Sequence, residues 1–409
     1  MSDTNLSAIA GILKRRYDDM LVLQQNLSHR AMDSIAKTLT KHSPGGEGYF
    51  GAMNDYGNES VGAINEEEQF RTIDAEHAQQ WKVIPKVLVG PIQFSGLAAE
   101  AAKGDDESFV DSVLDALDKA KDRLLKDENR QFFGYGQGVL GAPGGAVASA
   151  ATSFSVNYAQ YFRANQVIDI YTSVGGSSIV TALRIADVDR ANARLVFAAP
   201  VAGTLATTNV IVKQNILANT PPADGKEMMG LRGIVDDGTD VTTFQNISVN
   251  STLNLIWKAR RIDASSANLS SDLLQRLIDD VAINCGEEPD TLIMHRAQRR
   301  KYLDIVVPQK RYADGDMDSG FSELEFNGKK LILDDDCQLD TVYAIRKKLI
   351  QKYELKALAM GTHDGSDVFL RLANYDVFQA YWRHYCNFGT SQRNAHGKLV
   401  SLAVPTALS

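Results

Sequence analysis

The chain has 409 residues, 44% hydrophobic and 23% charged, which is enough apolar sequence for a sizeable core in two to three domains. Its net charge of −8 provides no global electrostatic reason to bind nucleic acid or an anionic membrane. Cys285, Cys337 and Cys386 are widely spaced and odd in number, which indicates free thiols in a reducing compartment. The N-terminus lacks a signal-peptide pattern, and no apolar run approaches the roughly 18 residues of a membrane span, so we expect cytoplasm-like conditions.

The first hundred residues do not form a domain by themselves. Apolar residues at helical spacing predict one long helix over residues 4–40, which stops at Pro44-Gly45-Gly46. Residues 47–60 are glycine-rich and predict a loop, while residues 66–73 and 81–94 predict two extended arms. Ordering backbone costs about 1–2 kcal/mol per residue, so we expect neighbouring copies of the chain to bury this region.

The strongest helical pattern of the sequence covers residues 105–130. Asp105 or Asp106 is placed to cap the helix, a broad apolar stripe follows, and basic residues fill its second half. Acidic residues first and basic residues last complement the helix dipole. About 26 residues at roughly 1.5 Å each predict a rod near 39 Å long, which is suited to serve as the spine of a domain.

The rest of the chain alternates between strand and helix signals. Strands are predicted at residues 154–162, 166–172, 178–185, 194–199, 208–213, 291–294, 368–372, 377–382 and 399–404. Helices are predicted at residues 269–284 and 297–304, and residues 227–260 are predicted as loops with short helices. Asn327-Gly328 predicts a tight hairpin between two short strands.

Three groups of residues resemble chemical motifs and were each weighed against a structural role. Residues 136–141 match the letters of a dinucleotide fingerprint, but that motif needs a strand before it and a helix after it, and here a helix precedes it. Asp334-Asp335-Asp336 is interpreted as a solvated strand end. His384 and Cys386 share one strand face, but two ligands do not make a zinc site, so a buried strand is the preferred interpretation.

The densest basic cluster lies at Arg296, Arg299, Arg300 and Lys301. No aromatic platform is interleaved with these residues, so a protein–protein salt bridge is favoured over nucleic-acid binding. The sequence holds no GxSxG, P-loop, HExxH or EF-hand pattern, and no acid/base pair is recognisable. We therefore expect no enzymatic activity and predict no catalytic, cofactor-binding or metal-binding residue.

The order of these elements resembles the major capsid proteins of tailed bacteriophages, the Hong Kong 97-type fold. The resemblance is carried by the extended segment 47–95, the helix 105–130 with the following Gln131–Gly136, the segments 288–295 and 299–302, and the hairpin 326–335. It implies an α+β fold with an N-terminal helical arm, an extended loop, a long spine helix, a peripheral β-rich domain and an α/β axial domain.

The resemblance also implies domain boundaries and partners. The arm would comprise residues 1–43, the extended loop 44–104, the peripheral domain with its spine helix 105–225, and the axial domain, with strands that return to the peripheral domain, 226–409. The chain would self-assemble in the host cytoplasm, as pentamers and hexamers, into an icosahedral virion shell around DNA bound without sequence specificity. Portal, scaffold and decoration proteins are further possible partners, and no cofactor or membrane is expected.

Residues predicted to make assembly contacts are the aromatic and acidic residues of the extended loop and the basic residues of two helices. They are Tyr49, Phe50, Tyr56, Glu66, Glu67, Glu68, Phe70, Trp81, Lys119, Lys121, Arg123, Lys126, Arg296, Arg299 and Arg300. Because the loop has no core of its own, we expect that residues 48–93 are replaceable without loss of folding.

Three alternatives stay open at this point. A nanocompartment shell of the encapsulin kind would share the fold and enclose protein cargo. An α/β oxidoreductase would use the glycine loop Gly136–Gly141. A phage tail or adhesion protein is a third alternative, against which the long helix and the mixed second half of the chain argue.

Overall fold

The computed structural model describes residues 30–35, 48–56, 60–72, 77–96, 106–214, 225–249, 256–310, 325–361, 370–371 and 374–404. Most of the helix predicted over residues 4–40 lies outside these ranges, and only the short α2 (Arg30–Asp33) is described. The described residues divide into two compact units, one within residues 85–129 and 354–386, the other in the remaining segments. No described helix is long and apolar enough to cross a membrane.

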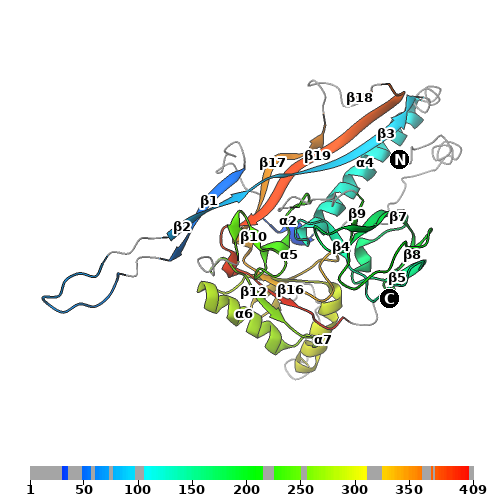
Figure 1. The fold of residues 1–409 in the computed structure, drawn as a ribbon. Coiled ribbons are helices and arrows are strands. Elements are labelled where there is room, and N and C mark those ends of the chain that lie inside the picture. The colour runs from blue at the N-terminus through cyan, green and yellow to red at the C-terminus, as the bar shows by residue number, and fades with distance from the viewer. Residues whose placement is uncertain are drawn as a thin grey trace. The chain divides into compact units, whose positions relative to one another are not determined.

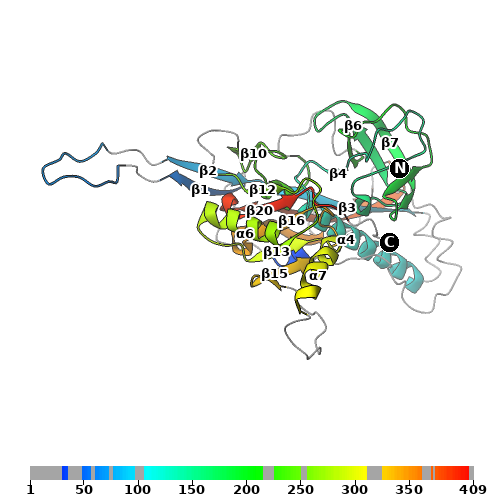
Figure 2. The same ribbon diagram turned by 90° about the horizontal axis from the view of Figure 1, so that it is seen from below.

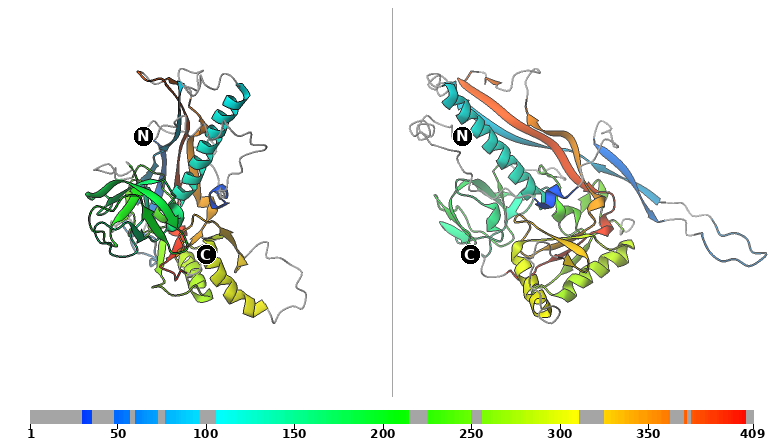
Figure 3. Two further views of the ribbon diagram at one scale, coloured as in Figure 1. Left: turned by 90° about the vertical axis from the view of Figure 1, so that its right-hand side faces the viewer. Right: turned by 180° about the vertical axis from the view of Figure 1, so that it is seen from behind.

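The first unit is built from a long helix and a four-stranded sheet. The helix predicted over 105–130 is confirmed as α4 (Asp106–Phe132), of which residues up to 129 belong here. The sheet contains β3 (Lys86–Ser95), β17 (Ile350–Met360), β18 (Leu370–Arg371) and β19 (Val377–Thr390). β3 pairs antiparallel with β19 over ten residues, and α4 runs alongside both strands (Figures 1 and 3).

Two close contacts hold α4 against this sheet. The indole Nε1–H of Trp382 donates a hydrogen bond to the Leu117 carbonyl oxygen at 2.9 Å. At Gly90 on β3, a Cβ atom would lie only 3.3 Å from Leu124 Cδ1, so the missing side chain lets strand and helix approach closely. Leu117 and Leu124 are buried, as expected for the apolar stripe of the helix.

The second unit contains two six-stranded sheets. The first, in the order β4-β9-β6-β7-β8-β5, is antiparallel and encloses an aliphatic and aromatic core. Its strands are β4 (Val139–Gly141), β5 (Ser153–Ser155), β6 (Val167–Tyr171), β7 (Ser178–Asp189), β8 (Arg194–Phe197) and β9 (Val210–Lys213). These strands confirm the β-rich region predicted after the long helix.

The other sheet is mixed and runs in the order β12-β20-β16-β13-β15-β14, with α6 and α7 packed on it (Figure 2). Its strands are β12 (Arg260–Asp263), β13 (Thr291–Met294), β14 (Glu325–Phe326), β15 (Lys329–Leu333), β16 (Val342–Ile345) and β20 (Gly397–Val400). α6 (Ser271–Cys285) begins where the Ser270 hydroxyl accepts the Leu273 N–H at 3.2 Å, and ends at Gly286, whose φ is 78°. α7 spans Arg296–Lys310.

Smaller elements complete the second unit. They are β1 (Tyr49–Tyr56), β2 (His77–Val83), α5 (Leu231–Ile234), β10 (Thr243–Phe244), β11 (Ile247–Ser248) and the short 3₁₀ turns Ala159–Tyr161, Lys347–Leu349 and Arg393–Ala395. β1 and β2 pair antiparallel in a two-stranded ribbon.

Several sequence predictions are wrong in the described residues. Residues 49–56, predicted as a loop, form β1, and the strands β16 and β17 were not predicted. Asp334 and Asp336, predicted to be solvated, are buried, because Asp334 accepts the backbone N–H groups of Ala31 at 3.2 Å and of Asp336 at 3.0 Å. The aspartate run is therefore part of the packing of the second unit.

Candidate assembly surface

The extended region is anchored at its base within its own chain. Tyr49 and Trp81 are only 4% and 5% exposed, and both rings pack against Tyr353, at centroid distances of 5.1 and 6.1 Å. At Gly51, a Cβ atom would lie 2.1 Å from the Trp81 indole, so only glycine lets that ring cross the ribbon. The chain itself therefore covers most of Tyr49 and Trp81, and their contact with a neighbouring subunit stays a prediction.

The middle of the ribbon is less buried. Phe50 is half-buried, and the Lys82 Nζ lies 5.5 Å from its ring centroid. The side chain of Tyr56 lies outside the described residues. Phe50 therefore keeps an accessible face on the ribbon.

The tip of the extended region, residues 60–72, continues beyond the ends of β1 and β2 (Figures 1 and 2). Every residue from 61 to 72 is exposed, and the apolar side chains of Val61 and Phe70 are 83% and 84% exposed. Glu66, Glu67 and Glu68 are exposed as well, and the Glu68 carboxylate accepts the Asn65 N–H at 2.9 Å. The tip therefore combines an acidic run with two apolar side chains that nothing in the described chain covers.

The basic half of α4 is partly engaged in its own unit. Lys121 Nζ lies 5.7 Å from the Trp382 ring centroid, in cation–π geometry. Lys119 and Lys126 are half-buried, whereas Arg123 is exposed. Of these four predicted contacts, Arg123 is therefore the most accessible.

The basic residues of α7 also differ in how far the chain itself contacts them. The Arg296 Nε lies 2.6 Å from Asp335 Oδ1, so its salt bridge is within the chain. Arg299 is half-buried and Arg300 is exposed. An ion pair to another subunit stays a prediction for these residues.

One face of β3 is exposed and was not among the contact surfaces predicted from the sequence. Val87 and Val89 are 63% and 50% exposed, whereas Leu88 between them is buried. Their cross-strand neighbours on β19 are Tyr385 and Arg383. The alternation of Val87, Leu88 and Val89 predicted a strand, but the sequence did not show which face would stay open.

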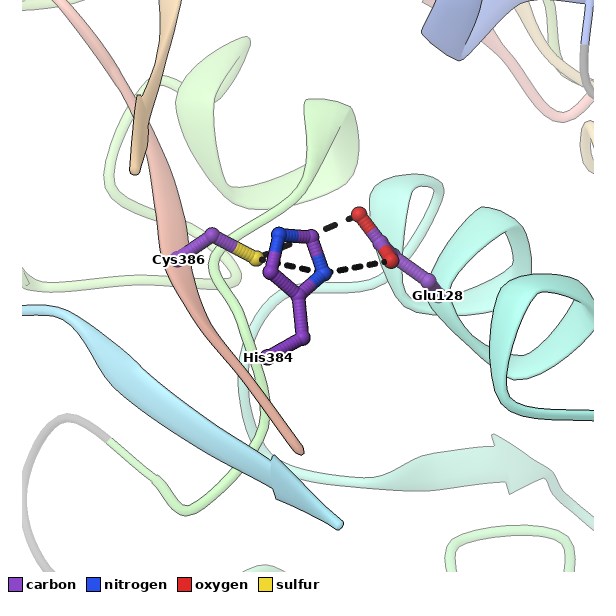
Figure 4. A group of neighbouring side chains, drawn as sticks. All are labelled: Glu128, His384 and Cys386. Atoms are coloured by element: carbon purple, nitrogen blue, oxygen red, sulfur yellow. Dashed lines mark hydrogen bonds and ion pairs between the residues drawn. The ribbon is translucent and has the colours of Figure 1, made fainter. Parts of the chain in front are cut away.

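Inside the first unit, His384 and Cys386 lie beside a third residue, Glu128, that the sequence did not indicate (Figure 4). His384 and Cys386 on β19 face Glu128 on α4, and all three are buried. The His384 Nδ1 lies 3.0 Å from Glu128 Oε2, and the Cys386 Sγ lies 3.6 Å from that Nδ1 and 3.9 Å from Glu128 Oε1. The buried strand predicted for His384 and Cys386 is confirmed, while Glu128, 256 residues away, could not be associated with them by spacing.

The glycine motif does not have dinucleotide-binding geometry. α4 ends at Phe132, and Val139–Gly141 form the strand β4 instead of opening a helix. A Cβ atom at Gly225 would lie 1.9 Å from the Gly136 carbonyl oxygen, so a neighbouring segment of the chain packs directly on this loop. The feature on which the oxidoreductase alternative rested is thus part of the packed second unit.

No protein-family model matches the sequence, and no curated protein matches it. Solved structures do match its fold. The capsid asymmetric unit of cyanophage A-1(L) aligns with 98% of this chain and 99% of its own, at 9% identity and a TM-score of 0.58. The capsid protein of a native GTA particle aligns with 98% and 100% of the two chains, at 8% identity and a TM-score of 0.50.

These matches cover nearly the full length of both chains, so the likeness extends to the order of all the elements. The chain therefore has the Hong Kong 97-type capsid fold that the sequence predicts. At identities this low, the likeness establishes the fold, and the role of the chain follows as a proposal.

Proposed function

We propose that this protein is the major capsid protein of a tailed bacteriophage, which self-assembles into an icosahedral shell around the phage genome. The observation that carries the proposal is the end-to-end match of the fold to capsid proteins of cyanophage A-1(L) and a GTA particle. The role is structural and needs no catalytic step. The subunit would assemble in the host cytoplasm and remain in the virion.

The exposed tip supports the same proposal from physical chemistry. Burying a large apolar side chain such as Phe70 or Val61 gives roughly 1.5–3 kcal/mol relative to leaving it in water. In the described residues both side chains are almost fully exposed, so this free energy is available to a contact between subunits. We propose that the tip residues 60–72 lie on a neighbouring subunit of the shell.

The charged residues of the tip would determine the register of its contact with the neighbouring subunit more than the strength of that contact. The acidic run Glu66–Glu68 meets its best complement in the basic half of α4 on the neighbour, where Arg123 is exposed. Exposed ion pairs contribute about 0–1 kcal/mol each, and their effect is on orientation and rate of association. The α7 residues Arg296, Arg299 and Arg300 are proposed as a second contact between axial domains.

The shell would have partners of several kinds. The chain itself would supply pentamers and hexamers. Its net charge of −8 provides no global attraction to phosphates, so the enclosed DNA would be held without sequence-specific binding. Portal, scaffold and decoration proteins are proposed as further partners of the assembled shell.

Negative-stain electron microscopy of the purified full-length protein tests the proposal. We expect closed, angular shells, or capsomers that close into shells as the protein concentration rises. A monomer that persists over a hundredfold range of concentration would contradict self-assembly. Shells that enclose one protein at fixed stoichiometry, when the chain is expressed together with its flanking genes, would instead indicate a nanocompartment.

A further inference from the structure

The first unit contains a buried cluster of three side chains whose donor atoms converge on one point. They are Glu128 on α4 and His384 and Cys386 on β19, with exposed fractions of 0%, 2% and 0%. We infer that Glu128, His384 and Cys386 form a structural zinc site that joins α4 to β19. This inference is independent of the capsid proposal, because it rests only on the geometry of these side chains.

The positions of the three residues follow from the secondary structure. Side chains two residues apart on a strand point to the same face, so His384 and Cys386 both face the helix. The Trp382 hydrogen bond to Leu117 fixes the start of the contact. From there, the 11 residues to Glu128 advance about 16 Å along the helix, and the four residues to Cys386 advance about 13 Å along the strand. The register of strand and helix therefore brings the carboxylate opposite the imidazole and the thiol.

The distances between donor atoms fit tetrahedral coordination. Zinc binds Cys sulfur at about 2.3 Å and His nitrogen or carboxylate oxygen at about 2.0–2.2 Å, so neighbouring ligand atoms lie about 3.3–3.8 Å apart. Here the Nδ1–Sγ distance is 3.6 Å, the Sγ–Oε1 distance is 3.9 Å and the Nδ1–Oε2 distance is 3.0 Å. Shifts of a few tenths of an ångström convert this arrangement into a zinc site.

The orientation of the Glu128 carboxylate strengthens the argument (Figure 4). One of its oxygens faces the imidazole Nδ1, and the other faces the Cys386 sulfur. A carboxylate in this orientation can bind the ion through either oxygen or through both, on the side of the ion that the imidazole and the thiolate leave open.

A second carboxylate orients the histidine in the way that metal sites commonly require. The His384 Nε2 lies 2.7 Å from Glu354 Oε1, on the ring edge opposite the cluster. When Nε2 carries the ring proton, its N–H donates a hydrogen bond to Glu354. The lone pair of Nδ1 is then directed toward Glu128 and Cys386. Metal-binding histidines regularly donate their second ring N–H to a carboxylate, so Glu354 is assigned as a positioning residue.

The donor set also selects the metal. A thiolate and an imidazole are soft or borderline ligands that suit zinc, whereas magnesium and calcium prefer sites made only of oxygen. Zinc binds cysteine as the thiolate, so binding would release the thiol proton of Cys386. A divalent ion would also balance the negative charge that the carboxylate and thiolate bring into this buried position.

The test uses purified full-length protein that has been dialysed against EDTA and then desalted. Zinc chloride is added, free zinc is removed, and bound metal is counted by plasma mass spectrometry; in parallel, cobalt(II) replaces zinc and the absorption spectrum is recorded. We expect one zinc per chain, and a near-ultraviolet thiolate-to-cobalt charge-transfer band. The cobalt spectrum of the unmodified protein needs no variant, so it tests the site even if a substitution prevents folding.

Variants separate the site from adventitious binding. Cys386→Ser and His384→Gln should lose stoichiometric zinc, and Cys386→Ser should lose the charge-transfer band. The matched control Cys285→Ser removes a thiol on α6 and should retain both. Glu354→Gln should keep one zinc and the band but weaken affinity about 10- to 100-fold.

Two results would overturn the inference. The first is an unmodified protein that binds no zinc and gives no cobalt charge-transfer band, which would leave the cluster as a hydrogen-bonded network alone. The second is zinc binding that persists unchanged in Cys386→Ser, which would place the metal elsewhere.

Discussion

The tip of the extended region and a buried ion network, formed by Arg393, Asp236 and Lys398 of β20, treat charged and apolar side chains in opposite ways. In the tip, residues 61–72 are all exposed, and Phe70 is 84% exposed. In the network, the charged side chains Arg393, Asp236 and Lys398 are at most 1% exposed, and Lys398 Nζ lies 2.8 Å from Asp236 Oδ1. The first region leaves apolar groups in water, and the second removes charges from it.

The difference indicates where each region obtains its stabilisation. Each charge of the network is satisfied inside the chain: Arg393 donates to the carbonyl oxygens of Gly233 and Ile234, both at 2.8 Å. Burial by itself raises the pKa of Asp240, but hydrogen bonds and charges from Arg232 and Lys398 outweigh it and hold that pKa well below its usual range. The network therefore stabilises the subunit, whereas the apolar side chains of Val61 and Phe70 in the tip are exposed and available to another subunit.

The largest expected effect comes from breaking the network. Arg393→Ala removes a buried cation and leaves Asp236 and the carbonyl groups of three residues without it, so we expect a loss of about 3–5 kcal/mol of unfolding free energy. Urea unfolding of unassembled subunits measures it. The exposed Arg190→Ala is the matched control, expected to change stability by less than about 0.5 kcal/mol. A loss below about 1 kcal/mol for Arg393→Ala would show that the network is not a source of stability.

A change in the spine helix should be nearly as severe. Leu117→Pro removes a backbone hydrogen bond in the middle of α4 and costs about 3 kcal/mol or more, so we expect insoluble protein. The volume-conserving Leu117→Met should cost less than about 1.5 kcal/mol and remain soluble. Normal particles from the proline variant, seen by electron microscopy, would show that α4 does not support the first unit.

Acid should weaken the second unit through His396. Burial, together with the charges of Arg346 and Arg393, lowers the pKa of His396 to about 3. In the unfolded chain, His396 binds a proton near the ordinary histidine pKa of about 6.5. Its contribution to the free energy of unfolding is therefore fully present above pH 6.5. The free energy of unfolding falls by about 1.4 kcal/mol per pH unit as the pH decreases from there toward 3.

Urea unfolding of unassembled subunits at pH 7, 6 and 5 measures this slope. His396→Gln should flatten it while the other histidines are retained. An unchanged slope in the variant would exclude His396 as its source.

The smallest expected effect is electrostatic tuning of the tip. Reversing Glu66, Glu67 and Glu68 to lysine should slow shell assembly at low salt and matter little at high salt, because screening shortens the range of exposed charges. Light scattering at two ionic strengths measures the rate. An equal loss at both ionic strengths would indicate that the three residues act through shape or folding instead of charge.

Elements specified by local pattern were predicted well. α4 combines a 3.6-residue apolar period with suitable charges at each end, and the Asn327-Gly328 turn alone specifies the β14–β15 hairpin. β1 was missed because the glycines of residues 47–60 indicate a loop locally. Gly51 is required there by Trp81, which lies 30 residues later and packs on Tyr353.

Contacts between distant parts of the chain also explain what the sequence did not indicate at the extended region and at the buried cluster. Tyr49 and Trp81 were assigned to an interface because no core was evident near them in sequence, yet β17 supplies Tyr353 from far along the chain. Glu128 joins His384 and Cys386 only through the register of α4 against β19. Contacts between residues hundreds of positions apart depend on tertiary packing, and no spacing rule anticipates them.

Because Tyr49, Trp81 and Val83 are buried, the replacement of residues 48–93 that the sequence analysis considered harmless should instead unfold the subunit. The direct test of the account therefore changes the tip alone. Residues 60–72 are replaced by a Gly-Ser linker of equal length, and Phe70→Ser is made as a single substitution. Val174→Ser, a partly exposed apolar residue in the turn between β6 and β7, is the control.

Urea unfolding and electron microscopy are then measured on the same preparations. We expect unfolding free energies within about 0.5 kcal/mol of the unmodified protein for all three variants. We also expect closed shells for Val174→Ser, few for Phe70→Ser and none for the linker variant. Normal shells from the linker variant, at unchanged stability, would contradict the account, because they would show that the tip makes no contact on which assembly depends.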